Sequence, residues 1–240
     1  MRTSIVRLKQ MNEQILALLP MKAHSERVPD KNMRLFNGRP LYHAVMGSLL
    51  KSKYISQVII NTDSARIKHD AMHFFGDSVV IHDRPEAIQG DHVSMNRIIA
   101  HDLENLAGSH FLQTHSTNPL LRTETINKAI KTYFLILKKG YDSLFSVTKL
   151  QKRLYDKDWK PINHDPNELI RTQDLPPIFD ENSCLYLFHR RGFESAGRRI
   201  GINPYLFEIP REEAIDIDEA LDFKIAESLS HHDEHTHRKP

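Results

Sequence analysis

One stretch near the start of the chain decides the fold: residues 14–61 read QILALLPMKAHSERVPDKNMRLFNGRPLYHAVMGSLLKSKYISQVIIN. Residues 14–19 form a short apolar run that Pro20 ends, and residues 57–61 form a second one. Runs of this length are typical of buried strands. Between them, residues 40–50 begin with a proline and repeat apolar side chains at helical spacing, which predicts a helix with one apolar face. The stretch therefore predicts a strand, a loop, a helix and a second strand.

The same alternation continues along the chain. It predicts helices at residues 65–75, 95–106, 125–137 and 219–229, and strands at 78–81, 110–113, 143–147 and 184–188. Strands that alternate with helices are typical of α/β proteins, so we expect a Rossmann-like, mainly parallel sheet with helices on both faces. Ligands of such sheets bind beyond the carboxyl ends of the strands.

A single domain over residues 14–230 accounts for this pattern. Within it, residues 149–181 carry many charges, Trp159 and several prolines without a clear period. This segment predicts an extended excursion that either covers the site or reaches a second subunit. We expect residues 1–13 and 231–240 to be flexible termini, with a metal-binding tail as the alternative for the last ten residues because they include His231, His232, His235 and His237.

The composition narrows the class of protein. Lys and Arg number 33 and Asp and Glu 31, so the formal net charge over 240 residues is only +2, which argues against a nucleic-acid binder with a basic surface. Cys184 is the only cysteine and lies in an apolar run, which predicts a core residue in a reducing compartment, hence a cytoplasmic protein. We expect no signal peptide and no membrane association.

The loop after the first strand gathers the basic side chains of Lys22, Arg27 and Lys31 with the hydroxyl of Ser25. Charged donors that converge beyond the end of a strand suit a polyphosphate. Few glycines are available, since the chain has 9, so side chains must take the place of a glycine-rich phosphate loop. The alternative is an ordinary solvated basic loop.

Two carboxylates near the other end of the chain form the second candidate site. Asp216 and Asp218 alternate with Ile215 and Ile217, so a short strand with the isoleucines in the core places both carboxylates on the opposite face. Two adjacent carboxylates repel each other unless a cation lies between them, and their hard oxygen atoms favour Mg²⁺. The alternative is that Asp218 caps the helix that follows.

In order along the chain, these segments resemble the CMP-sugar-acid synthetases, the cytidylyltransferases that activate sialic acids and related nonulosonic acids, with the Kdo-activating enzymes as a more distant branch. The resemblance spans residues 14–227 and rests on five places: residues 22–41, 61–64, 84–91, 173–186 and 215–222. In the first loop, the spacing of Ser25, Arg27, Pro29 and Lys31 is similar to the Kdo branch, whereas the sialic branch has Lys-Gly where this chain has Glu26 and Arg27.

The resemblance implies a role for individual residues. Contacts to CTP fall on Lys22, Ser25, Arg27, Lys31, Asn32, Arg84, Val93 and Met95. Contacts to the acceptor sugar fall on His115, Gln173 and Asn182, where Ser183 replaces the family's usual glycine. Asp216 and Asp218 match the family's metal-binding pair, and with Lys22, Arg27 and Lys31 they make up the implied catalytic set.

The implied function is Mg²⁺-dependent transfer of CMP from CTP to the anomeric hydroxyl of a nonulosonic, nine-carbon or related sugar acid, with release of pyrophosphate. Two alternatives remain open at this point: a nucleotidyltransferase for Kdo or another sugar acid, and a non-catalytic relative that binds nucleotide. The resemblance also implies a homodimer in which residues 149–181 reach the partner subunit.

Overall fold

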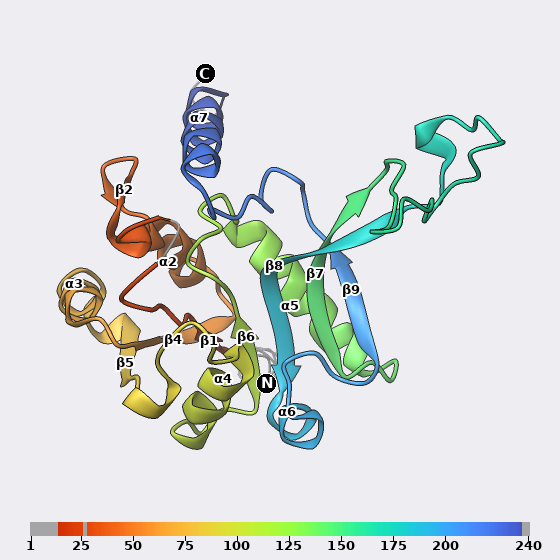
Figure 1. Cartoon of the computed structure of the whole chain (residues 1–240). Helices are drawn as coiled ribbons and strands as arrows, with labels where there is room; N and C mark the ends of the chain where they lie inside the picture. Colours follow the sequence, from red (N-terminus) through yellow and green to blue (C-terminus); the bar gives the residue numbers. More distant parts are fainter. Residues whose placement is uncertain (1–13, 26–27, 237–240) are drawn as a thin grey trace, which may run out of the picture.

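The computed structural model describes residues 14–25 and 28–236, with side chains as far as residue 230. Within this part a seven-stranded sheet has the spatial order β5 (Val79–Asp83), β4 (Ile55–Thr62), β1 (Ile15–Leu18), β6 (His110–Gln113), β8 (Ile178–His189), β7 (Ser143–Leu150) and β9 (Pro204–Glu208) (Figure 1). β1 pairs in parallel with β4 and β6, β4 with β5, and β7 with β9. Only β8, among the described strands of this sheet, runs antiparallel to its neighbours β6 and β7. The prediction of a mainly parallel sheet is confirmed.

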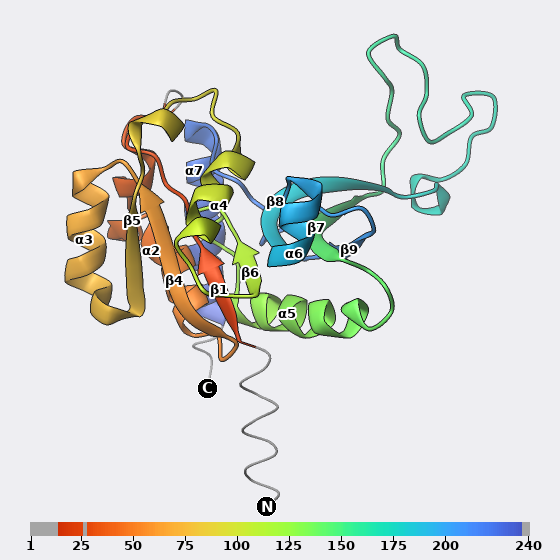
Figure 2. The same cartoon turned by 90° about the horizontal axis from the view of Figure 1, so that it is seen from below.

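Helices cover both faces of the sheet, as predicted (Figure 2). One face packs against α2 (Tyr42–Leu50), α3 (Ala65–Phe75) and α5 (Thr123–Leu137), and the other against α4 (Met95–Glu104) and α6 (Arg190–Ala196). The strand β1 and Leu19, which follows it, show why this stretch is apolar throughout. Ala17 and Leu19 pack in the hydrophobic cluster on one face of the sheet, while Leu16 and Leu18 pack in the cluster on the other face. Successive side chains of a strand point to opposite faces, so a strand covered on both sides is apolar on both; in β1, Leu16 is partly buried and the other three residues are buried.

The last helix, α7 (Ala220–Thr236), joins a third, smaller cluster. Its Phe223 and Ala226 pack with Phe36 and Leu41 beside the two-stranded ribbon of β2 (Leu35–Phe36) and β3 (Arg39–Pro40). Ile217 completes this cluster. The end of the chain is thereby anchored next to the loop that follows β1. Short 3₁₀ turns complete the described structure: η1 (Lys31–Met33), η2 (Gly76–Ser78), η3 (Glu86–Ile88) and η4 (Thr172–Asp174).

The sequence pattern does not predict α6 and β9, nor the two-residue strands β2 and β3. The helix α6 has seven residues and begins with two arginines, and Phe193 is its one buried residue, so it shows no apolar period. The strand β9 begins with Pro204 and buries only Phe207 among its five residues, because it forms the edge of the sheet. By contrast, α3 and β6 have the predicted bounds. Buried periodic elements are predictable from sequence, whereas short peripheral ones are not.

Residues 151–177, between β7 and β8, project away from the body of the molecule (Figures 1 and 2). Within residues 149–181, the ends of β7 and β8 pair at the base of this arm, and the rest is mostly irregular. Trp159 is 86% exposed and Leu169 94% exposed in this arm.

At both ends of the chain, some residues lie outside the part that the structure describes. The predicted flexible segment 1–13 lies there, as do residues 237–240 and the side chains of 231–236, so the histidines of the tail are not placed. The helix α7 continues through Thr236, seven residues beyond the predicted end. Among the described residues, no helix combines the length and the apolar character needed to cross a membrane.

Candidate functional site

A cavity of about 360 Å³ opens beyond the carboxyl ends of β1, β5 and β6. Side chains from four parts of the chain line it: the loop after β1, the segment from β5 to α4, the segment after β6, and the acidic segment before α7. Ten of the predicted site residues are among them: Lys22, Ser25, Lys31, Asn32, Arg84, Val93, Met95, His115, Asp216 and Asp218. Arg27, with its neighbour Glu26, lies outside the described residues. The cavity thus lies where ligands of parallel sheets bind, beyond the carboxyl ends of the strands.

The loop after β1 is held in place by its polar side chains. Lys22 forms an ion pair with Asp91, across the cavity mouth from the loop. Asn32 donates from Nδ2 to the Lys22 carbonyl oxygen (3.2 Å) and accepts from the Ser116 hydroxyl (2.6 Å). These contacts tie both ends of the loop to the cavity wall, so that backbone glycines are not required there.

The segment from Asn61 to Ser64 stabilises the same region from behind. The Asp63 carboxylate accepts from the backbone N–H of Ala23 at 2.7 Å, which fixes the start of the loop after β1. Ser64 caps α3 by accepting from the N–H of Ile67, a common role for serine at a helix start. Asn61 accepts from Arg84 Nε at 2.8 Å. The family resemblance rests in part on residues 61–64 but implies no role for them.

The acidic segment is extended but is not a strand, so that part of the prediction is wrong. Its alternation is nevertheless as expected: Ile217 is fully buried and donates its N–H to the Thr117 carbonyl oxygen (2.9 Å), while Asp216 and Asp218 line the cavity. The segment does not pair with a strand, because Ile217 bonds to Thr117, which lies in the loop after β6. The amino end of α7 is capped by Asp222, whose carboxylate accepts from the N–H groups of Asp218 and Glu219.

The two carboxylates differ in their surroundings. Oδ1 of Asp216 is buried and has no hydrogen-bond partner among the described residues. Burial raises the pKa of Asp216, with the Thr117 side chain opposing the shift and Asp218 adding to it. Lys31 approaches from the other side, with Nζ 3.2 Å from Asp218 Oδ1. A buried, unpartnered carboxylate oxygen beside a second carboxylate fits a divalent cation.

His115 lies at the inner wall of the cavity, and its Nε2 is buried without a hydrogen-bond partner among the described residues. Burial lowers the pKa of His115 to about 4, with Arg199 and Lys31 contributing. The imidazole is therefore neutral at neutral pH. It offers a nitrogen that can donate to or accept from a ligand, depending on the tautomer.

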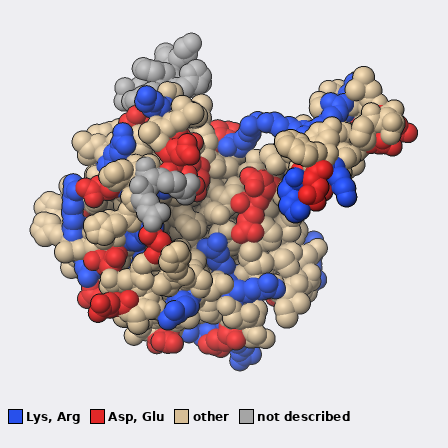
Figure 3. Space-filling view, viewed as in Figure 1, with Lys and Arg blue, Asp and Glu red and all other residues tan. Residues whose placement is uncertain are grey.

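Charges of both signs are interspersed on the face of the molecule shown in Figure 3. That face carries no continuous basic stripe of the kind that tracks a nucleic-acid backbone.

Comparison with known proteins identifies the family to which the chain belongs. Residues 16–233 match the family described as Cytidylyltransferase. The chain belongs to this family. A curated relative, an N-acylneuraminate cytidylyltransferase A from Danio rerio, is 26% identical over 227 residues, which cover 91% of this chain and 51% of the relative. The chain thus spans about half the length of this relative.

Relatives of similar length also match. A CMP-N,N'-diacetyllegionaminic acid synthase from Legionella pneumophila is 26% identical over 231 residues, which cover 90% of this chain and 95% of the relative. Among solved structures, a CMP:2-keto-3-deoxy-manno-octonic acid synthetase complexed with CTP superposes with a TM-score of 0.67 at 14% identity, covering 92% of this chain and 99% of that chain. At that identity the likeness shows the shared fold alone.

Two residues predicted for the acceptor sugar do not line the cavity. Gln173 lies in η4 of the projecting arm. Asn182 is buried in β8, where it accepts from the Ser146 hydroxyl (2.6 Å) and donates to Thr148 Oγ1 (2.9 Å) on β7. Within this one chain Asn182 fastens two strands together. Ser183, next to it, has φ of 59°, a conformation that favours the glycine found there in the cytidylyltransferases that the sequence resembles.

One further residue beside the site, Arg199, carried no assignment from sequence. Arg199 bonds through Nη1 to the side-chain oxygen of Gln113, and its guanidinium lies 3.5 Å from the ring centroid of Tyr186. Cys184, on β8, is fully buried, and burial raises the pKa of its thiol, which confirms the predicted core residue. Arg199 escaped notice because it lies between α6 and β9, the two elements without a sequence pattern.

Proposed function

We propose that this chain is a Mg²⁺-dependent cytidylyltransferase that transfers CMP from CTP to the anomeric hydroxyl of a nonulosonic sugar acid. The observation that carries the proposal is the single cavity in which the basic loop meets the acidic pair, with Lys31 Nζ 2.6 Å from the Ile217 carbonyl oxygen and 3.2 Å from Asp218 Oδ1. Family membership supports the nucleotide, and the names of the relatives support the class of acceptor.

In the proposed reaction, the anomeric oxygen forms a bond to the α-phosphorus of CTP while the bond from that phosphorus to the bridging oxygen of the β-phosphate breaks. Pyrophosphate leaves, and the hydroxyl proton passes to a carboxylate of the acidic pair. Negative charge spreads over the phosphoryl oxygens in the transition state, so positioning and electrostatic neutralisation supply the catalysis. Lys22 and Lys31 would bind the β- and γ-phosphates, and Arg84 would contact the nucleotide from the opposite wall.

The acidic pair fits a divalent cation, because a buried carboxylate oxygen of Asp216 lacks a partner among the described residues and Asp218 lies on the same wall. Asp216 and Asp218 would hold Mg²⁺. When bound, the ion supplies positive charge to the phosphate oxygens.

The proposed acceptor is a sialic-type acid because the curated relatives include enzymes named for acylneuraminic and diacetyllegionaminic acids. Kdo is the alternative, favoured by the structural likeness to an octonic acid synthetase and by the spacing of the first loop. We further propose a cytoplasmic homodimer in which the projecting arm, with its exposed Trp159 and Leu169, packs on a second copy and brings Gln173 toward the partner's site.

Pyrophosphate release tests the proposal directly. The protein is assayed with Mg²⁺ and each of the four nucleoside triphosphates, against sialic, legionaminic, pseudaminic and Kdo acids. We expect release with CTP and a nine-carbon acid, with the CMP-sugar confirmed by mass. Release with Kdo alone would support the alternative acceptor. CTP binding with background release for every acid would indicate a non-catalytic relative. Light scattering at micromolar concentration tests the dimer, and a monomer there contradicts it.

A further inference from the structure

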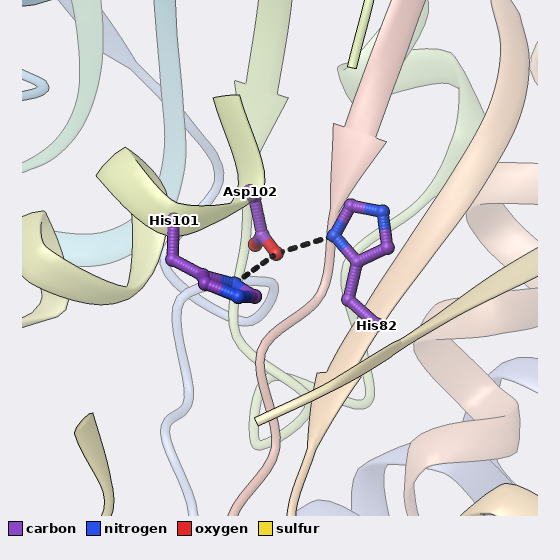
Figure 4. Close-up of side chains that lie close together, drawn as sticks. All are labelled: His82, His101 and Asp102. Carbon is purple, nitrogen blue, oxygen red and sulfur yellow. Dashed lines mark hydrogen bonds and ion pairs between the residues drawn. The ribbon is translucent and has the colours of Figure 1, made fainter. Parts of the chain in front are cut away.

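A buried polar cluster lies directly behind Arg84, outside the cavity. It consists of Asn61 at the end of β4, His82 on β5, and His101 and Asp102 on α4. Figure 4 shows the two histidines and Asp102. Asp102 and Asn61 are both fully buried. His82 Nδ1 lies 2.7 Å from Asp102 Oδ1, and Asn61 Nδ2 lies 2.7 Å from the same oxygen. A buried carboxylate held this closely requires an explanation, because burying charge is costly.

The cluster is connected to the cavity through a single side chain. Arg84 donates from Nε to Asn61 Oδ1 (2.8 Å) and from Nη2 to the Asn61 carbonyl oxygen (2.9 Å). The other end of the Asn61 amide donates to Asp102. An unbroken line of hydrogen bonds therefore runs from the cavity wall to the carboxylate on α4.

Two histidines and an aspartate also resemble a metal site, since their ligand atoms lie within 4.8 Å of one another. The orientation of Asn61 argues against a cation shared by Asp102 Oδ1 and His101 Nδ1. Arg84 can only donate, so it fixes the amide with its oxygen toward the guanidinium and its NH₂ group toward the cluster. That NH₂ group then donates to Asp102 Oδ1 and to His101 Nδ1, 3.3 Å away. These N–H groups engage Asp102 Oδ1 and His101 Nδ1, whereas the other carboxylate oxygen, Oδ2, is buried without a hydrogen-bond partner among the described residues.

We infer that Asn61 and Asp102 are positioning residues, which orient the Arg84 guanidinium toward the phosphates of a bound nucleotide. Asp102, held by His82, fixes the amide of Asn61, and the amide fixes Arg84. This inference rests on the proposed function, because it takes a nucleotide as the ligand of the cavity.

The amide between carboxylate and guanidinium has a chemical consequence. A direct ion pair with Asp102 would occupy Arg84 and offset its charge, whereas a neutral amide orients it and leaves it cationic. Of the five N–H donors of the guanidinium, two are bonded to Asn61 among the described residues, which leaves the others for a ligand. Burial lowers the pKa of Arg84, and the nearby Asp63 and Asp102 oppose that shift.

The first test observes Arg84 without any ligand. Its Nε–H resonance, assigned by its loss in Arg84→Lys, is followed by ¹⁵N relaxation and solvent exchange. In the wild type we expect an ordered, slowly exchanging Nε–H. Asn61→Ala and Asp102→Ala should make it mobile, whereas Asp102→Asn should restore it, because an amide oxygen still accepts from Asn61. An Arg84 that stays ordered in Asn61→Ala overturns the inference, as does an Asp102→Asn variant that behaves like Asp102→Ala.

The second test measures CTP affinity by calorimetry. We expect Asn61→Ala to weaken CTP binding by about tenfold, the size of effect given by losing one preorganising hydrogen bond. In an Arg84→Ala background the same substitution should have almost no effect, since coupled residues are not additive. Equal losses in both backgrounds would show a merely structural role.

The matched control for both tests is Asp70→Asn. Asp70, on α3, forms a similar but only partly buried pair with His43 Nε2 (2.6 Å), and α3 packs on the face of the sheet opposite to α4. It should lower the melting temperature while leaving Arg84 ordered and CTP affinity unchanged. If wild-type protein binds no CTP but its Arg84 is ordered through Asn61, the proposed function fails and the positioning of Arg84 stands.

Discussion

The Lys31 ammonium lies 3.2 Å from Oδ1 of Asp218, although the two residues are 187 positions apart in the sequence. It also donates to the Ile217 carbonyl oxygen at 2.6 Å. Among the described residues, Lys31 therefore joins the two candidate sites, one basic and one acidic, within the cavity. A cation beside the acidic pair lowers its mutual repulsion, and it lies where the phosphates of a nucleotide would meet a metal ion.

The acidic pair should be indispensable for turnover. We expect Asp216→Asn to lower kcat by at least about a hundredfold, because it removes a charged ligand of the proposed Mg²⁺. The readout is pyrophosphate release at saturating CTP. Glu212→Gln, in the same segment but exposed, is the control and should leave kcat unchanged. Activity above about a tenth of the wild type, a loss of only about 1.4 kcal/mol, would contradict the role.

Lys31 should contribute chiefly to nucleotide binding. Lys31→Met keeps the aliphatic stem but removes the charge that would contact a phosphate, and a charge-assisted hydrogen bond is worth about 1.5–3 kcal/mol. We therefore expect CTP affinity, measured by calorimetry with Mg²⁺ present, to fall by roughly ten- to hundredfold. Lys138→Met, at the exposed end of α5, should have no effect. Unchanged affinity in Lys31→Met would place the phosphates elsewhere.

His115 should make the protein sensitive to acid. Its pKa falls from 6.5 to about 4 on folding, so the unfolded chain binds a proton that the folded chain does not. The free energy of unfolding contributed by His115 is therefore fully present above about pH 6.5 and is lost as pH falls toward 4. Denaturant unfolding at pH 8 and pH 5 should show a smaller loss in His115→Gln than in the wild type. The other histidines are common to both proteins, so equal losses would contradict the assignment.

Ser183 should be replaceable by glycine with a gain in stability. Its φ of 59° is left-handed, a conformation that costs a side-chain-bearing residue about 1–2 kcal/mol. Ser183→Gly loses the hydrogen bond between the Ser183 and Tyr186 hydroxyls (3.2 Å), but the Tyr186 hydroxyl keeps its hydrogen bond to the Glu181 carboxylate. We expect the free energy of unfolding to rise by about 1 kcal/mol. Ser195→Gly, within α6, should instead destabilise by about 0.5–1 kcal/mol.

Much of the site could be predicted from sequence because its residues occur in short, chemically distinctive segments. Lys22, Ser25, Lys31 and Asn32 follow one strand, and Asp216 and Asp218 alternate with buried isoleucines. Gln173 and Asn182 were assigned by resemblance alone, and neither lines the cavity of this chain. Their side chains belong to the arm and its base, whose position relative to the cavity no local pattern describes. Their role in binding the acceptor stays a prediction.

The sequence by itself determined the order of strands and helices and the residues that carry charge to the ends of the strands. Hydrophobic periodicity is a local property, so it identifies buried elements wherever they occur along the chain. The tertiary structure alone decided which side chains meet: Lys31 with Asp218, and Arg84 with Asn61 and, through it, Asp102. Such contacts depend on how crossovers place distant strands side by side and on which side chains lose water. The sequence alone does not show whether an asparagine is buried or exposed, and its role depends on the residues that it contacts in the folded protein.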